Sequence, residues 1–151
     1  MGFFDQLFGV GKLRPVMATA AADPGVLLVM EGGRATCRGT LKTPRRYAHR
    51  FYSRHGAALV ILPHRFMLSV GRYVVVDEWP GAVDGPLSTH VRVHEGGVAV
   101  HIDVAAAVGG TGHIDIELAT AIPPHALAAL PQREWHGVLA GPDPQLTLQR
   151  I

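Results

Sequence analysis

Short apolar segments follow one another along most of this sequence, and glycine or proline turns separate them. Segments of about four to eight residues that are rich in valine, isoleucine and leucine and end at such turns are typical of β-strands. The predicted strands cover residues 26–31, 34–42, 46–53, 57–62, 65–70, 73–77, 89–93, 98–104 and 111–119. These closely spaced strands predict a mainly β fold, either an antiparallel barrel or a two-sheet sandwich.

The three strands at residues 57–62, 65–70 and 73–77 contain the densest aliphatic runs and are separated by the clearest turns. We therefore expect them to form a central antiparallel meander. The side chains expected in its core are Val60, Leu62, Phe66, Leu68, Val74 and Val76.

Short helices are expected near the two ends of the chain. Proline suits the first turn of a helix, which predicts helices at residues 15–22 and 124–130. A last strand is predicted at residues 145–151. The i, i+3, i+4 spacing predicts a further helical stripe that docks on the protein's own core, on a partner or on a membrane surface. This docking stripe consists of Phe3, Phe4, Leu7 and Phe8.

The length of 151 residues, of which 48% are hydrophobic and 17% charged, fits one globular domain. We divide it into an N-terminal helical segment (1–22), a barrel-like core (26–130) and a C-terminal extension (131–151). The single cysteine, Cys37, excludes a disulfide within the chain and any zinc site built from several cysteines.

No apolar run approaches the roughly 18 residues that a transmembrane helix needs. The N-terminus has no basic residue before Lys12 and carries Asp5 within its apolar stretch, which does not resemble a signal peptide. The expected location is the cytoplasm, with peripheral membrane contact as an alternative.

Positive charge is concentrated in one part of the chain. Between residues 32 and 76 there are nine basic residues and no acidic residue, although the net charge of the whole chain is only +2. Such a block indicates contact with an anion, such as phosphate or a lipid headgroup, or with an acidic protein surface. Alternatively, the acidic C-terminal half packs beside it and offsets the charge. The anion-binding candidates are Lys42, Arg45, Arg46, Arg50 and Arg54.

Tyr47, Phe51 and Tyr52 are interleaved with these basic residues, a combination that single-strand nucleic-acid binders use for stacking. The modest net charge of the whole chain disfavours nucleic acid as the first choice of partner. An unknown protein partner, self-association and peripheral contact with anionic lipid are the partners that we expect instead.

The sequence GAALVILPHRFMLSV at 56–70, followed by YVVVDEWP at 73–80, resembles the central hairpin of bacterial pleckstrin-homology-like domains. The resemblance covers roughly residues 26–130 and departs from that family in the short, proline-bounded helix and the residues after it. It implies a binding module on a β-barrel. In eukaryotic members spaced Lys and Arg between the first two strands bind phosphoinositides, and Lys42, Arg45, Arg46 and Arg50 fall near that region.

Two similar tetrapeptides, HIDV at 101–104 and HIDI at 113–116, fall on what should be neighbouring antiparallel strands. Because side chains alternate along a strand, His101, Asp103, His113 and Asp115 should share one solvent-facing surface while the isoleucines point inward. A two-residue turn at Gly109-Gly110 would mix the faces, so an odd loop length or a bulge is expected there. These four residues could bind a divalent metal, but cross-strand His–Asp pairs are the preferred interpretation, and we expect no bound metal.

Nothing in the sequence predicts catalysis. Cys37 is expected to be a buried apolar residue, and Ser53, His55 and His64 lack the context of a nucleophile elbow. No phosphate-binding glycine loop is found, so no cofactor is predicted. We therefore expect a non-enzymatic binding or scaffold domain. The alternatives are a small-molecule carrier or enzyme with an internal cavity, and a homo-oligomeric subunit that associates through the docking stripe.

Overall fold

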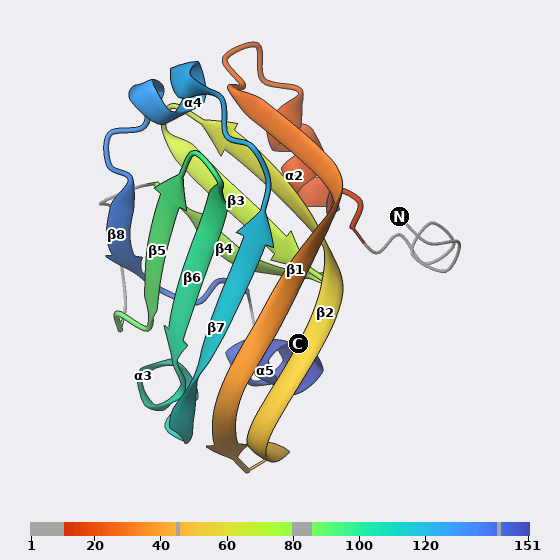
Figure 1. Ribbon diagram of the computed structural model, residues 1–151, viewed down its shortest axis with the longest axis vertical. Coiled ribbons are helices and arrows are strands. Elements are labelled where there is room, and N and C mark those ends of the chain that lie inside the picture. Colours follow the sequence, from red (N-terminus) through yellow and green to blue (C-terminus); the bar gives the residue numbers. More distant parts are fainter. Residues whose placement is uncertain (1–10, 45, 80–85, 142) are drawn as a thin grey trace.

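The computed structural model of the chain describes residues 11–44, 46–79, 86–141 and 143–151 (Figure 1). Its strands are β1 (Leu28–Thr43), β2 (Arg46–Leu62), β3 (Arg65–Val70), β4 (Tyr73–Glu78), β5 (Thr89–His94), β6 (Gly97–Asp103), β7 (Thr111–Ala119) and β8 (Glu134–Gly137). They form one sheet in the order β4-β3-β2-β1-β7-β6-β5-β8, and every neighbouring pair is antiparallel. The predicted antiparallel β architecture is confirmed.

The sheet curls until its two edge strands approach each other, so that the fold is a nearly closed barrel. The backbone N–H of Ala140, just after β8, donates to the carbonyl of Val75 in β4 at 3.1 Å. Short helices lie at the two ends of the barrel and against one part of its outside. In Figure 1, α4 (Pro124–Ala129) lies at one end of the barrel, α5 (Pro144–Arg150) at the other, and α2 (Pro15–Ala21) beside β2.

Apolar side chains from all eight strands fill the space between the strands. Phe66 of β3 meets Trp135 of β8 edge to face, with ring centroids 5.2 Å apart. The aliphatic residues Leu59, Leu68 and Ile116 are among the fully buried side chains of this cluster. The burial of such a core supplies most of the free energy that opposes chain entropy.

A second, smaller core lies on the outside of β2 and β3, where Met17 and Ala20 of α2 cover Val60, Leu62 and Met67. The C-terminal half of β2 is therefore buried on both faces. This explains why residues 57–62 are apolar throughout instead of alternating. The predicted meander at 57–62, 65–70 and 73–77 is confirmed. Of its expected core residues, Val60, Leu62, Phe66, Leu68 and Val76 are buried, whereas Val74 is half-buried against α2.

Two strand boundaries differ from the prediction. Residues 26–31 and 34–42 were expected to be separate strands joined by a turn at Gly32-Gly33, but β1 continues through both glycines. A register shift between Met30 and Gly33 places an extra residue in β1 opposite β2, so the backbone bulges instead of reversing. Residues 46–53 and 57–62, which were also predicted as two strands, form the single strand β2, because residues 54–56 pair with β1 as well.

The connection between β6 and β7 is a helical turn, α3 (Val104–Val108), and not a two-residue hairpin. The carboxylate of Asp103 accepts a hydrogen bond from Ala106 N, and Gly109 ends the helix in the left-handed region with a φ of 80°. The connection keeps His101 opposite Asp115, so the two faces are not mixed.

The predicted strand at residues 145–151 is wrong, because residues 144–150 form α5. Pro144 occupies the first turn, and the Asp143 carboxylate accepts a hydrogen bond from Leu146 N at 3.1 Å. Leu148 and Ile151 then pack against the core of the barrel. The predicted helices at 15–22 and 124–130 are confirmed as α2 and α4. The docking stripe of Phe3, Phe4, Leu7 and Phe8 lies outside the described residues.

Candidate functional site

One broad surface carries most of the candidate residues. We call it the outer face: the side of β2, β1, β7, β6 and β5 that points away from the barrel core. It is turned toward the viewer in Figure 1, and none of the described helices lies in front of it. Its side chains alternate with buried ones such as Cys37, Leu41, Ile114 and Ile116.

The β1–β2 half of the outer face combines basic and aromatic side chains. Cross-strand partners project to the same side of a sheet, and Arg38 is paired with Tyr52 and Lys42 with Tyr47. Tyr47 is 70% exposed and Tyr52 is 61% exposed. Both phenol rings therefore stand in solvent beside a basic neighbour.

A bulge brings the two tyrosines to the same face. Tyr47 and Tyr52 are five positions apart, and regular alternation would place them on opposite sides of β2. The register shifts between Gly39 and Leu41, where one residue of β1, Thr40, lies opposite two residues of β2, His49 and Arg50. The extra residue reverses the alternation, so that both rings project outward.

The basic candidates do not all belong to this surface. Lys42, Arg50 and Arg54 are exposed and make no ion pair within the described part of the chain. Arg45 lies outside the described residues. Arg46 is turned the other way: it is paired with Thr43 in line with buried Leu41, and its guanidinium stacks over Phe51 at 4.8 Å.

The guanidinium of Arg46 instead caps the end of α5. Its Nη1 donates to the carbonyl oxygens of Leu148 at 3.0 Å, Gln149 at 3.3 Å and Ile151 at 3.1 Å. Carbonyl groups at the end of a helix lack partners within the helix, and a cation there is favourable. Arg46 therefore has a structural role that the sequence prediction did not anticipate.

The other half of the outer face contains paired histidines and carboxylates. His101 Nδ1 lies 2.7 Å from Asp115 Oδ1, and His113 Nε2 lies 3.8 Å from Asp115 Oδ2. The rings of His101 and His113 are stacked with centroids 5.5 Å apart. Asp103 also lies on this face but binds the first turn of α3. In the described ranges no group of three or more His, Cys, Asp or Glu side chains is placed to hold a metal ion.

A second histidine pair, which the sequence analysis missed, lies farther along the same face. His90 of β5 and His136 of β8 are stacked with centroids 4.5 Å apart, and His90 Nε2 lies 2.6 Å from Glu134 Oε1. The two histidines are direct cross-strand partners. Only the pairing of β5 with β8 brings them together, and no short-range spacing in the sequence indicates that pairing.

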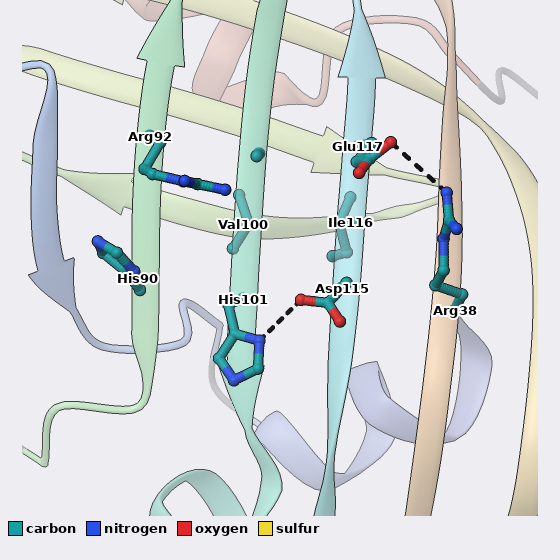
Figure 2. Close-up of a pocket in the computed structure, with 9 residues that line it drawn as sticks. Arg38, His90, Arg92, Val100, His101, Asp115, Ile116 and Glu117 are labelled. Atoms are coloured by element: carbon teal, nitrogen blue, oxygen red, sulfur yellow. Dashed lines mark hydrogen bonds and ion pairs between the residues drawn. The ribbon is translucent and has the colours of Figure 1, made fainter.

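Two hollows lie on the outer face. The first, of about 440 Å³, is lined by Arg38, His90, Arg92, Ala99, Val100, His101, Asp115, Ile116 and Glu117. Figure 2 shows Arg92 reaching from β5 toward β6, while Arg38 approaches Glu117 from β1. Arg38 Nη2 and Glu117 Oε2 are 3.6 Å apart, and both side chains are more than half exposed. Such an exposed pair contributes little to stability and remains available to a ligand.

The second hollow is a groove of about 700 Å³ at the β2 bulge. It is lined by Arg38, Gly39, Thr40, Arg50, Phe51, Tyr52, His113 and Asp115. Volumes of about 300–1,000 Å³ are those of typical small-ligand sites. The groove brings the ring of Tyr52, the imidazole of His113 and the guanidinium groups of Arg38 and Arg50 beside the carboxylate of Asp115. The Phe51 ring is turned inward, under the guanidinium of Arg46.

Cys37, Ser53 and His55 lie together on the side of β1 and β2 that faces the barrel interior. Cys37 is fully buried, and its burial raises the pKa of the thiol to about 11. Ser53 Oγ lies 3.1 Å from His55 Nε2, and burial together with the charge of Arg46 lowers the pKa of His55. A hydroxyl beside a neutral imidazole is part of a hydrolase triad, but no carboxylate among the described residues is bonded to His55. The Cys37 thiol is a buried core group, as the sequence predicted, and its raised pKa disfavours the reactive thiolate.

Comparison with protein-family models, curated proteins and solved structures finds no match to this chain. Among the helices of the described residues, none is long and apolar enough to cross a membrane.

Proposed function

We propose that the chain is a non-enzymatic binding domain that contacts an anionic partner through the β1–β2 half of its outer face. The carrying observation is that Lys42, Arg50 and Arg54 are exposed there and form no ion pair with the described residues. A cytoplasmic location is part of this proposal, because the anionic leaflet and other polyanions face that compartment.

The position of the acidic residues supports this assignment. Of the other described strands that pair with β1 or β2, only β7 carries carboxylates, and these belong to Asp115 and Glu117, near Arg38. The carboxylate of Glu31 in β1 itself accepts a hydrogen bond from Leu13 N. In the N-terminal part of β2, residues 46–56, the described residues provide no strand partner other than β1. The acidic C-terminal half therefore offsets part of the basic block and leaves the charge on β2 unbalanced.

The packing of the barrel favours an outer binding surface over an internal cavity. Large apolar side chains such as Phe66, Trp135 and Ile102 occupy the interior. The carrier alternative would need several hundred cubic ångströms of that space. The resemblance to pleckstrin-homology-like domains implies the same class of function and remains a prediction.

Retention on immobilised heparin, a polyanion, tests the proposal. We expect the double variant Lys42→Glu/Arg54→Glu to elute at clearly lower salt than the unchanged protein, because exposed charge attraction is screened by salt. The matched control, Arg133→Glu/Arg150→Glu, makes the same change in net charge at exposed positions away from the outer face. Equal elution of the two double variants would overturn the proposal. Circular dichroism verifies that both variants are folded.

A further inference from the structure

Two exposed aromatic rings remain unexplained by a purely electrostatic surface. Tyr47 and Tyr52 contribute to none of the buried clusters, and both are more than 60% exposed. They stand on the same face as Arg38, Lys42 and Arg54 only because β2 has a bulge between them. Exposed aromatic groups interleaved with basic ones mark a surface that meets a ligand with both flat apolar and anionic parts.

The spacing of these groups follows the strand. The partners of the two tyrosines, Arg38 and Lys42, are four residues apart in β1, which corresponds to about 14 Å at the rise of an extended strand. Two separate flat groups can therefore stack on the two rings, with positive charge next to each. The groove of about 700 Å³ beside Tyr52 adds the imidazole of His113 and the guanidinium of Arg50 to the same track.

We propose that the anionic partner is a single-stranded nucleic acid, whose bases stack on Tyr47 and Tyr52 while its phosphates meet Lys42, Arg50 and Arg54. This inference rests on the proposed function and names its partner. Stacking on aromatic side chains along a basic groove is how sequence-tolerant single-strand binders obtain affinity. The low net charge of the whole chain does not oppose it, because the fold gathers the basic residues on one half of one face.

Competing partners fit the surface less well. A duplex keeps its bases stacked on each other and offers them no free ring face. An extended peptide would add to the edge of β2, but the bulge and the charged residues Arg50 and Arg54 oppose strand addition there. A lipid headgroup would satisfy the basic residues and leave the stacking geometry of the tyrosines without a role.

Fluorescence anisotropy with two labelled probes of equal charge tests the inference. One probe is an oligothymidine of about 15 nucleotides, and the other is an abasic strand with the same number of phosphates. We expect the oligothymidine to bind at least about tenfold more tightly, since only its bases can stack on the two tyrosine rings. Equal binding of the two probes, or binding of neither, would overturn the inference while leaving heparin retention intact.

Variants assign the base-dependent binding to the two rings. Tyr47→Leu/Tyr52→Leu keeps every charge and is expected to lose about tenfold or more in affinity for oligothymidine, with unchanged heparin elution. The control is Trp79→Leu, which removes an aromatic side chain that is 55% exposed directly after β4, away from the β1–β2 half of the outer face. An equal loss in both variants would contradict the assignment.

Vesicles and duplex DNA distinguish the other sources of anionic charge. Vesicles of phosphatidylserine and phosphatidylcholine, and a duplex of the same length as the oligothymidine, are offered as competitors. We expect both to displace the labelled oligothymidine less effectively than unlabelled oligothymidine does at equal phosphate concentration. Displacement by vesicles that depends on Tyr47 and Tyr52 would overturn the inference in favour of a membrane surface, and equal displacement by the duplex would overturn the single-strand preference.

Discussion

The indole Nε1 of Trp135 donates a 2.8 Å hydrogen bond to Oε1 of Glu78 and thereby joins β8 to β4, the two edges of the sheet. The other carboxylate oxygen, Oε2, accepts from Val138 N at 3.3 Å. Gly137 lies against this carboxylate so closely that a Cβ there would overlap it. This acidic side chain and the backbone bond from Ala140 N to the Val75 carbonyl therefore join the two edge strands of the sheet, which do not pair as strands.

Replacing Trp135 with phenylalanine is expected to lower the free energy of unfolding by about 1–3 kcal/mol. The ring contact with Phe66 remains, but the half-buried Glu78 carboxylate loses a donor, and an unsatisfied buried acceptor carries that cost. Urea denaturation measures the change. The control is Trp79→Phe at an exposed position, which should stay within about 0.5 kcal/mol of the unchanged protein. Equal effects would show that the bond does not stabilise the closure.

Glu78 should also give the fold a specific pH dependence. Burial raises the pKa of its carboxyl group above the ordinary value, and the bonds from Trp135 and Val138 only partly oppose this. The folded state then holds a proton that the unfolded chain has already released. The contribution of Glu78 to stability is therefore complete below its unfolded pKa and is lost as the pH rises through the raised value.

The matching measurement compares the unchanged protein with Glu78→Gln by urea denaturation from acidic to neutral pH. The difference in unfolding free energy should shift in favour of the glutamine variant as the pH rises, and then level off. The glutamine carbonyl can still accept from Trp135, so the variant is expected to fold. A difference that is independent of pH would contradict a raised pKa for Glu78.

Much of the fold was predictable because its signals are local. The strands at 57–62, 65–70 and 73–77 are dense aliphatic runs with short turns between them. Residues 145–151 misled the prediction, since Leu146 and Leu148 alternate with polar residues as in a strand. Their helical state depends on the cap from Asp143 and on packing against the open end of the barrel. The latter is a tertiary interaction that no short window of sequence contains.

The candidate site was predictable in composition but not in geometry. The block of basic residues is visible in the sequence, and alternation along the strands correctly predicts that one sheet face carries His101, Asp103, His113 and Asp115. It could not place Tyr47 with Tyr52, because that depends on a bulge for which no residue type is a clear marker. The partner of Arg46 is 102 residues away in the chain, so its capping role was equally hidden.

Gly39 should be among the least replaceable residues of the outer-face strands. Its φ of 156° falls at the edge of the region that favours glycine, and a Cβ would overlap the carbonyl oxygen of His113 in β7. We expect Gly39→Ala to cost about 3 kcal/mol or more, because backbone on two strands must move. Gly109→Ala is the matched control. Its φ of 80° imposes a conformational cost of about 1–2 kcal/mol, but nothing lies within 4 Å of the added Cβ. Equal melting temperatures would refute the steric argument.

Arg46 is expected to stabilise the fold, whereas Arg54 is expected to contribute to binding but not to stability. Arg46→Met keeps the aliphatic stem but removes three charge-assisted bonds to the end of α5, for an expected loss of about 1.5–3 kcal/mol in unfolding free energy. Arg54→Met removes an exposed side chain and should change stability by no more than about 0.5 kcal/mol.

The two variants should show the reverse order on immobilised heparin. The Arg46 guanidinium is turned to the inner side and is occupied by helix carbonyls, so its loss should change the eluting salt concentration less than the loss of Arg54. Unfolding free energy and eluting salt concentration are therefore measured for both variants. Arg46→Met should be the less stable of the two, and Arg54→Met should be the one that elutes at lower salt. If Arg46→Met reduced heparin retention more than Arg54→Met while the two were equally stable, the assignment of Arg46 to α5 and of Arg54 to the binding face would be wrong.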